Sequence, residues 1–395
     1  MKVVLISTNA GLDMGGEAIK AYQYFRYLLD QGFDAYLLTH ERNEAGLRAD
    51  FPNERLIFVR DSALQKFLWR SVIFRRLLAP VFHLEVAKLA LQFDKADTVL
   101  HYIGPVSPVE PRFPPRGYRV LMGPFTGNIY YPPAFAHRMS IDNRLAQAFH
   151  KFTQNFYGAI FGDKKRAARI LVSGYERTRA SLKWAGCSDA QLKDVVDSGI
   201  SAEYEAMGRA GQSGTNTAFA LSGRMVDHKG TDLAIQALTL SDPSITLTLY
   251  GDGPKKASHE ALAKYLGVAD RVNFAGWLDH DEVIQGIHRH RGYLFPSLAE
   301  ANGIVMQEAM MLGVPVVALR WGGPANLADD HSAIYVDPTS EEAVVKGLAA
   351  AMDRLAFDPD YAETLSVNAR KIAEARFPWD KVAKSYSENY GDILG

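Results

Sequence analysis

The sequence has little of what several protein classes require. Its 395 residues include one cysteine, Cys187, which excludes a disulfide scaffold and a cysteine-based metal cluster and suits a reducing compartment. No apolar run reaches the roughly 18–20 residues of a membrane-spanning helix. The first residues form a segment that is too short and too strand-like for a signal peptide. We therefore expect a soluble cytoplasmic protein.

The sequence also lacks the signatures of two common kinds of catalytic site. The sequence has no H-E-x-x-H pattern for zinc and no G-x-S-x-G turn for a nucleophilic serine. The nearest histidine cluster, His288 and His290, lies among Arg289 and Arg291, which would repel a cation. We expect neither a metal site nor a bound cofactor.

The formal net charge of -1 hides an asymmetry between the two halves of the chain. Residues 1–200 hold 27 Lys and Arg against 19 Asp and Glu, whereas residues 201–395 hold 17 against 26. Opposite charges indicate that the halves meet different partners. We do not expect nucleic acid among them, because the basic residues are interleaved with acids and no nucleic-acid-binding motif occurs.

Length and pattern predict two α/β domains. With 47% apolar and 23% charged residues, the chain is globular and too long for one ordinary core. Short β-branched runs alternate with amphipathic stretches, starting with Lys2–Ser7 and a helix over 17–30, which favours parallel sheets covered by helices. The small, polar segment Gly199–Gly214 is the expected linker, and the alternation restarts at Ala218–Leu221. The sequence therefore predicts two Rossmann-like domains facing across a cleft.

The loop over 222–231 carries two cations between a predicted strand and a predicted helix. Ligands of such sheets lie beyond the carboxyl ends of the strands. Arg224 and Lys229 are five residues apart in this loop. Unpaired N–H groups and the helix dipole favour a phosphate at a helix N-terminus, and a guanidinium with an ammonium suits a diphosphate. A merely solvated loop is the alternative.

A second loop, over 300–310, carries two carboxylates. The helix is expected to begin near Asn302, which leaves Glu300 in the loop and places Glu308 about two turns further on. Carboxylates accept hydrogen bonds from sugar and ribose hydroxyls, so this pair with the amides between suits a sugar nucleotide. A buried Glu308 would need polar partners. A surface Glu on an ordinary helix is the alternative.

The loop after the first strand contains Gly15 and Gly16. Glycine allows the backbone to approach a phosphate closely, as in dinucleotide-binding folds. The spacing from Gly11 differs from the G-x-G-x-x-G fingerprint, so an NAD site is poorly supported and an ordinary turn is the alternative.

Several short motifs in the second half occur together. They are Gly223-Arg224 with Lys229-Gly230, Tyr250-Gly251-Asp252-Gly253, Val272-x-Phe274-x-Gly276, Phe295-Pro296-Ser297, Glu300-x7-Glu308-Ala309 and Gly313-x-Pro315-Val316-Val317. In order and spacing this set resembles the retaining glycosyltransferases of family 4, which have the GT-B fold. The first half matches more loosely, through the opening strand, the glycine pair and the following helix.

The resemblance implies an architecture and an activity. A Rossmann-like acceptor domain would span 1–200, a nucleotide-sugar donor domain 201–376, and the helix over 377–395 would return to the first domain. The enzyme would be a metal-independent retaining hexosyltransferase. It would move a hexose from a UDP- or GDP-linked sugar to a glycan or lipid-linked acceptor, in cell-surface polysaccharide or glycolipid synthesis.

The resemblance also implies roles for individual residues. Arg224 and Lys229 would hold the donor diphosphate and stabilise it as a leaving group. Glu308 would bind the ribose hydroxyls, and Glu300 would bind those of the donor sugar. The backbone positions expected against the donor are Ala301, Asn302, Gly303 and Ile304 at the sugar and phosphate, Gly276 and Trp277 at the base, and Gly15 and Gly16 at the diphosphate.

Two positions depart from the family pattern. Asn302 stands where the family usually has phenylalanine or a similar residue, which alters the expected sugar pocket. Many members also have an H-x-H pair after a strand of the first domain, and here His101 is followed by Ile103 at the second position. His101 is the candidate for a catalytic contact to the donor sugar, and a structural role at the strand end is the alternative.

The stretch over 64–91 combines cations such as Lys66 and Arg70 with aromatic residues such as Phe67 and Trp69. A basic, aromatic amphipathic helix can lie on an anionic membrane, which would place the protein peripherally at the inner face of the plasma membrane. The alternative is a helix that packs its aromatic side chains into the core. The proline-rich loop over 123–133 is either an acceptor wall or a stiff loop.

Two rival functions use the same fold. A sugar-nucleotide epimerase of the non-hydrolysing kind is disfavoured by Arg224 and Lys229 together with Glu300 and Glu308. A catalytically silent binding protein is disfavoured by the same cations and by Glu308, whereas Ile103 is compatible with it.

Overall fold

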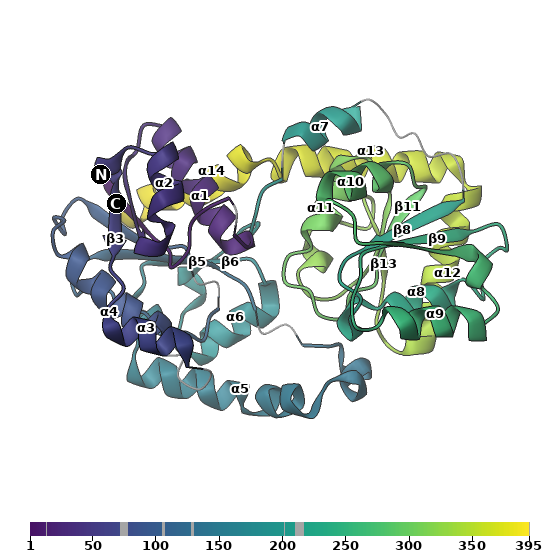
Figure 1. Ribbon diagram of the computed structural model, residues 1–395, viewed down its shortest axis with the longest axis horizontal. Coiled ribbons are helices and arrows are strands. Elements are labelled where there is room, and N and C mark those ends of the chain that lie inside the picture. The colour runs from purple at the N-terminus through teal and green to yellow at the C-terminus, as the bar shows by residue number, and fades with distance from the viewer. Residues whose placement is uncertain are drawn as a thin grey trace. The chain divides into compact units, whose positions relative to one another are not determined.

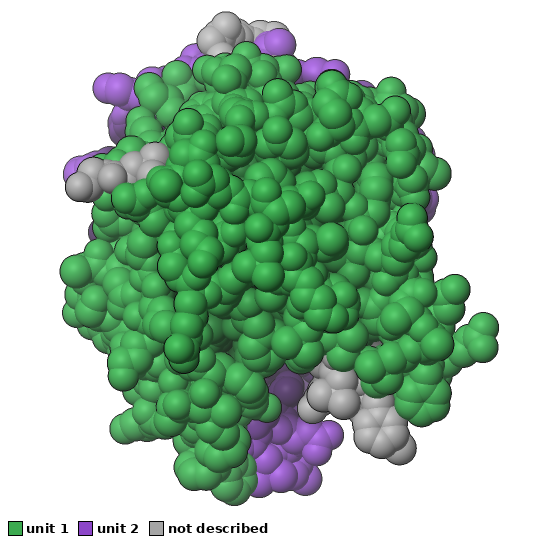
Figure 2. All heavy atoms as spheres, turned by 90° about the vertical axis from the view of Figure 1, so that its left-hand side faces the viewer, with its two compact units in different colours: residues 1–128, 147–199, 379–395 green, residues 129–146, 200–378 purple. Residues whose placement is uncertain are grey.

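The structure is a computed structural model that describes residues 1–12, 14–71, 78–104, 107–127, 130–200, 202–209 and 217–394. The chain forms two compact units, which are coloured separately in Figure 2. The first unit comprises Met1–Asn128, Gln147–Gly199 and Trp379–Gly395, and the second comprises Ile129–Ala146 and Ile200–Pro378. Each unit is built on one parallel sheet (Figure 1).

The sheet of the first unit has the strand order β3-β2-β1-β4-β5-β6-β7, with every adjacent pair parallel. The strands are β1 Lys2–Ile6, β2 Asp34–His40, β3 Leu56–Val59, β4 Thr98–Tyr102, β5 Arg119–Phe125, β6 Arg169–Val172 and β7 Leu192–Asp194. The central strands β1 and β4 are buried almost throughout, since helices cover both faces of a parallel sheet.

Helices pack on both faces of this sheet. They are α1 Gly16–Asp30, α2 Glu44–Asp50, α3 Ala63–Arg70, α4 Leu78–Ala90, α5 Ile141–Ile160, α6 Tyr175–Trp184 and α14 Trp379–Leu394, with α5 beginning in the second unit. Val3 and Leu5 of β1 face a core cluster with α1 and α14. Val4 and Ile6 face a second cluster with α4 and α6, as the alternation of side chains along a strand requires.

The sheet of the second unit has the strand order β10-β9-β8-β11-β12-β13, again with parallel neighbours. The strands are β8 Ala218–Ser222, β9 Thr246–Tyr250, β10 Val272–Gly276, β11 Gly292–Phe295, β12 Val316–Leu319 and β13 Ile334–Val336. The helices are α7 Ala202–Arg209, α8 Thr231–Ala237, α9 Lys256–Tyr265, α10 His280–His288, α11 Ile304–Met311, α12 Glu341–Phe357 and α13 Pro359–Arg376. Figure 1 shows α8 and α9 on one side of this sheet and α10, α11 and α13 on the other.

Both sheets are doubly wound. In each, the chain runs outward from the first strand to one edge and then crosses to the other side, so the order reverses between β1 and β4 and between β8 and β11. The predicted α/β fold with two Rossmann-like parallel sheets is confirmed.

The predicted extent of the first domain, 1–200, is wrong for one segment. Residues Ile129–Ala146 belong to the second unit. The guanidinium of Arg138 lies 2.7 Å from a carboxylate oxygen of Asp232 and 2.6 Å from one of Glu341, and these contacts anchor the segment there. The later boundary, after Gly199, adjoins the predicted one, and α14 lies in the first unit.

Parts of three predicted segments lie outside the described residues. The stretch over 64–91 contains α3 and α4, but residues 72–77 between them and the side chain of Trp69 are not described. The same holds for 201 and 210–214 of the expected linker, which otherwise contains α7, and for 128–129 of the proline-rich loop. Within the described ranges, no helix is both long and apolar enough to cross a membrane.

Candidate active site

The loops after β8 and β11 meet at the point where the strand order of the second sheet reverses. β9 lies beyond β8 and β12 lies beyond β11, so the two loops lead to opposite edges of the sheet. Such a divergence leaves a crevice at the carboxyl ends of the strands. Arg224 and Lys229 lie in the loop after β8, and Glu300 lies in the loop after β11. The topology therefore brings together the two loops that the sequence singled out.

A close backbone approach at Gly230 joins these loops. Gly230 has the left-handed conformation, with φ 67°, and a Cβ built there would lie 2.2 Å from the carbonyl oxygen of Pro296. Leu298 donates its N–H to the carbonyl of His228 at 2.7 Å. A larger residue at 230 would push the loops apart, so the glycine fixes Lys229 against the loop after β11.

The charged groups of the two loops form an ion pair. Nζ of Lys229 lies 2.6 Å from Oε2 of Glu300, and the two side chains are 21% and 22% exposed. The same Nζ lies 5.7 Å from the centre of the Phe295 ring. Because both charged groups are partly exposed, a ligand can reach them without opening the core. Two residues with predicted site roles are thus in direct contact.

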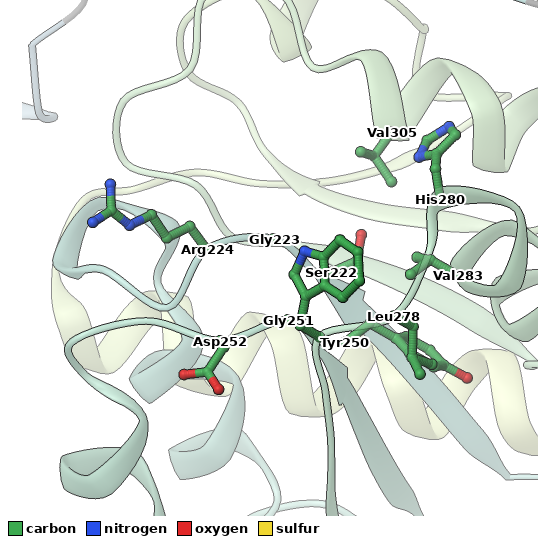
Figure 3. Close-up of a pocket in the computed structure, with 11 residues that line it drawn as sticks. Ser222, Gly223, Arg224, Tyr250, Gly251, Asp252, Leu278, His280, Val283 and Val305 are labelled. Carbon is green, nitrogen blue, oxygen red and sulfur yellow. The ribbon is translucent and has the colours of Figure 1, made fainter. Parts of the chain in front are cut away.

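A pocket of about 470 Å³ lies at the carboxyl ends of β8, β9 and β10. Its lining consists of Ser222, Gly223, Arg224, Tyr250, Gly251, Asp252, Trp277, Leu278, His280, Val283 and Val305. Figure 3 shows Arg224 and His280 on opposite sides of the view. Of the residues with predicted roles, Arg224 and Trp277 line this pocket. Trp277 is 73% exposed and follows Gly276, whose carbonyl accepts the N–H of Gly251 at 2.7 Å.

Glu308 is a buried carboxylate with one oxygen paired. It is 3% exposed, and its Oε1 lies 3.0 Å from Nε2 of His280 on α10. Its Oε2 has no hydrogen-bond partner in the described part of the chain. The hydrogen bond that His280 donates to Glu308 raises the pKa of His280 above its ordinary 6.5. Burying a carboxylate oxygen without a donor is costly, so Oε2 of Glu308 is an unsatisfied acceptor on a side chain that contacts His280, which lines the pocket.

The sequence did not predict His280 as a site residue. Asp279 and Glu282 form a capping box that begins α10 at His280, and this D-x-x-E signal was available from the sequence. The signal fixes the start of the helix, but not the contact with Glu308 on another helix 28 residues away. His280 also meets Tyr204 of α7 edge to face, with ring centres 6.0 Å apart.

Residues 301–304 form the turn into α11. Gly303, with φ 78°, is the N-cap, so the helix begins one residue after it at Ile304. The side-chain oxygen of Asn302 accepts a hydrogen bond from Nε2 of Gln307 at 3.1 Å. The asparagine that departs from the family pattern therefore ties the turn to the first part of α11.

No contact with the described part of the chain requires glycine at positions 15 and 16 of the first unit. Gly15 is the N-cap of α1, with φ -67°, and Gly16 is its first residue. A Cβ at either position would meet no atom of the described structure within 4 Å. Their predicted role against the donor diphosphate stays a prediction.

His101 lies inside the first unit. The side chain is fully buried in β4, with Nδ1 2.7 Å from the hydroxyl of Tyr390 and Nε2 2.9 Å from the carbonyl oxygen of Gly123. Burial lowers the pKa of His101 to about 3, so the ring is neutral. Nε2–H then donates to the carbonyl and Nδ1 accepts from Tyr390. This position favours the structural role that the sequence left open over a contact to the donor sugar.

Across the described residues, no group of three or more His, Cys, Asp or Glu side chains could hold a metal ion. Arg224 and Lys229 are the Lys and Arg residues of the loop between β8 and α8.

Residues 205–372 match the model of the family described as glycosyl transferases group 1. The architecture is the GT-B fold. The chain is similar to the structure of Anabaena HepE in complex with UDP, with a TM-score of 0.65 and 16% identity over 99% of this chain and 100% of that chain.

Curated relatives match over the second half of the chain. A glycogen synthase of Mycobacterium tuberculosis is 31% identical over 172 residues, which is 42% of this chain and 41% of the relative. The lipopolysaccharide core biosynthesis glycosyltransferase LpsD of Rhizobium meliloti is 32% identical over 165 residues, which is 42% of this chain and 46% of the relative. The matches thus span less than half the length of these relatives.

Proposed function

We propose that the protein is a retaining glycosyltransferase that moves a hexose from a UDP- or GDP-linked sugar to a glycan or a lipid-linked acceptor. The observation that carries the proposal is the contact of Lys229 with Glu300 across the two loops of the crevice. This contact places a cation and a carboxylate at one point, as a phosphate joined to a hydroxylated sugar requires. The retaining outcome rests on the motif resemblance.

Donor binding would use charges that the chain leaves accessible. Arg224 is exposed and has no ion-pair partner among the described residues, so a diphosphate can take up its guanidinium without breaking a contact. Glu308 differs, because it is 3% exposed; it would accept hydrogen bonds from the ribose after donor binding uncovers its unpartnered Oε2. The exposed indole of Trp277 offers an apolar surface at the base end of the pocket.

The chemical step would depend on charge stabilisation. When the bond between the sugar and the diphosphate breaks, negative charge grows on the leaving phosphate. Arg224 and Lys229, held in one loop, would stabilise that charge without a metal ion, and preorganised groups of this kind contribute more in the transition state than in the ground state. Glu300 would keep Lys229 in place and bind sugar hydroxyls. The expected cytoplasmic location stays a prediction.

The two rivals differ from this proposal in their products. An epimerase would convert the nucleotide sugar to its epimer and leave the diphosphate attached. A silent binding protein would bind the donor without turnover. Proton spectra of the nucleotide sugar after incubation with the protein and candidate acceptors distinguish transfer, epimerisation and simple binding.

The experiment is a thermal-shift screen with UDP-, GDP- and ADP-linked sugars on the wild type and Lys229→Ala. The right donor at about 100 times its dissociation constant should stabilise the wild type by about 2.7 kcal/mol. Lys229→Ala should lose most of that shift, and the rate of transfer should fall by about 100- to 1,000-fold, as for other preorganised charge-stabilising groups.

Lys346→Ala is the matched control, because Lys346 forms a surface ion pair with Glu342 in the same unit at 2.5 Å. It should keep both the shift and the rate. Absence of a shift with every nucleotide sugar, or identical shifts for wild type and Lys229→Ala, would overturn the proposal.

A further inference from the structure

Helix α5 packs on the first unit through polar and small residues. His150 is 7% exposed and its Nε2 lies 2.7 Å from Oγ of Ser181 on α6. Gln154, one turn later, is 1% exposed. Gly158, after another turn, lies against the backbone of Ala185, where a Cβ would be 2.4 Å from the carbonyl oxygen. The face of α5 that packs on the unit is therefore the row at positions 150, 154 and 158, of which His150 and Gln154 are buried.

The opposite face of α5 is apolar and exposed. The six apolar side chains of this row are Ile141 74%, Leu145 53%, Phe149 61%, Phe152 69%, Phe156 51% and Ile160 56% exposed. At about 100° per residue they fall within one third of the helix circumference, centred opposite the buried row. We call this row the α5 stripe. Figure 1 shows α5 at the periphery of the first unit.

This arrangement reverses the usual amphipathic helix. A surface helix normally turns its apolar stripe to the core and its polar residues to water. Here the polar row is buried and three phenylalanines face outward. Single exposed apolar residues are ordinary, but a continuous apolar row along a whole helix marks an interaction surface. One face of α5 thus packs on the core, and the other offers an apolar surface to a partner.

The charged side chains near the α5 stripe are mainly cationic, so an anionic surface would attract them. Arg144 and Lys151 are exposed, and because they are seven residues apart they lie along the same edge of the stripe. Lys165 and Arg166 are exposed just beyond the end of the helix. Among the described residues over 141–166, Asp142 is the one exposed acid.

From these observations we propose that α5 docks the protein on an anionic lipid bilayer, with the α5 stripe among the acyl chains and Arg144 and Lys151 at the headgroups. Long basic side chains beside an apolar row reach up to anionic headgroups while the row stays buried. A second copy fits less well, because an antiparallel two-fold pair would set the cationic edge of one helix against that of its partner. The proposal does not depend on the glycosyltransferase assignment.

The assignment to α5 differs from the membrane stretch predicted over 64–91. In that stretch, Phe82 is 1% exposed and Leu68 is 4% exposed, so part of the aromatic and aliphatic content is core. Leu64 and Phe67 are exposed at 53% and 58% on α3, but α3 has eight residues and carries two such side chains among those described. The longer row, with a polar row buried behind it, belongs to α5.

The test is sedimentation with vesicles of phosphatidylcholine alone and of phosphatidylcholine with phosphatidylglycerol. The wild type should bind the anionic vesicles, and the double variant Phe149→Gln, Phe152→Gln should bind about tenfold or more weakly. Arg144→Gln with Lys151→Gln should reduce binding to anionic vesicles and remove most of its salt dependence. Tyr265→Gln, which replaces an 87% exposed aromatic residue of α9, is the control and should bind as the wild type does.

A second measurement guards against loss of fold in the double variant. Phe152→Trp keeps an aromatic residue on the stripe, and its added fluorescence should shift to the blue with anionic vesicles. The proposal is overturned if the double variant binds as the wild type does, if Phe152→Trp shows no shift, or if size-exclusion shows a dimer that the double variant converts to monomer.

Discussion

The two sheets have the same strand order around the point of reversal, but they differ in how exposed the polar side chains are at that point. In the second unit, Lys229 and Glu300 lie in loops beyond the strand ends and stay about one fifth exposed. In the first unit, His101 lies within β4 and is fully buried. Residues within a central parallel strand are covered on both faces, whereas residues past its end can meet a ligand. The shared topology forms a crevice at the strand ends. Whether a side chain can reach a ligand in that crevice depends on whether it lies within its strand or past the end of the strand.

The same contrast appears in how the hydrogen bonds are completed. In the first unit, the hydroxyl of Tyr24 donates to that of Tyr390 at 2.9 Å, Tyr390 donates to His101, and His101 donates to Gly123. Every member of this chain has its partner inside the protein. In the second unit, Oε2 of Glu308 has none among the described residues. One set of polar groups stabilises the fold, whereas the buried Oε2 of Glu308 is left unsatisfied at a cost in stability.

The largest expected effect in this comparison comes from Glu308→Gln. The amide keeps the shape and removes the buried negative charge, so the free energy of unfolding of the unliganded protein should stay the same or rise. Hydrogen bonds to a charged acceptor contribute about 1.5–3 kcal/mol, so the KM for the donor should rise by roughly 10- to 100-fold. Steady-state kinetics and urea denaturation measure the two quantities.

Glu342→Gln is the control for this variant, because Glu342 is an exposed glutamate of the same unit. Neither its stability nor its donor KM should change by much. If Glu308→Gln destabilises the protein and leaves the donor KM unchanged, Glu308 belongs with the structural groups of the first unit and the contrast between the units fails.

A smaller effect, on stability alone, is expected from His101→Phe. The ring volume is kept, but Tyr390 loses its acceptor and the carbonyl of Gly123 loses its donor inside the core. Two unsatisfied buried groups should lower the free energy of unfolding by roughly 2–4 kcal/mol, and the folded protein should keep the donor kinetics of the wild type. Normal stability with a reduced kcat would instead identify His101 as a catalytic residue. The polar groups of the two units would then no longer differ in role.

Much of the fold could be predicted because the strands of parallel sheets have a strong local pattern. Ten of the strands coincide with short apolar runs bounded by glycine or polar residues, and the helix over 379–394 follows a proline start signal. The strands β3, β7 and β13 are hard to predict from the sequence, since they are three or four residues long and lie at the edges of the sheets. Nothing local in α5 shows that its apolar row faces outward, because that depends on what α6 presents to it.

Residues of the candidate site could be predicted where charged side chains lie in or near loops at fixed spacings along the sequence. Arg224, Lys229, Glu300 and Glu308 could be singled out because strands, loops and charges recur in order. The contact between Lys229 and Glu300 needs the switch point and the room that Gly230 provides. His280 could not be assigned to Glu308, since no local rule pairs residues of two different helices.

The smallest expected effect concerns pH and the pair of His280 with Glu308. The pKa of His280 is raised by its hydrogen bond to Glu308, so the pair stabilises the fold fully below pH 6.5 and loses that contribution as the pH rises through the folded pKa. The His280 side chain is 57% exposed, so solvent limits the contribution to roughly 0–1 kcal/mol. His280→Gln should therefore be less stable than the wild type at about pH 6 and equally stable at about pH 9. A constant difference between wild type and His280→Gln at both pH values would mean that packing against Tyr204, and not the charge of Glu308, holds His280 in place.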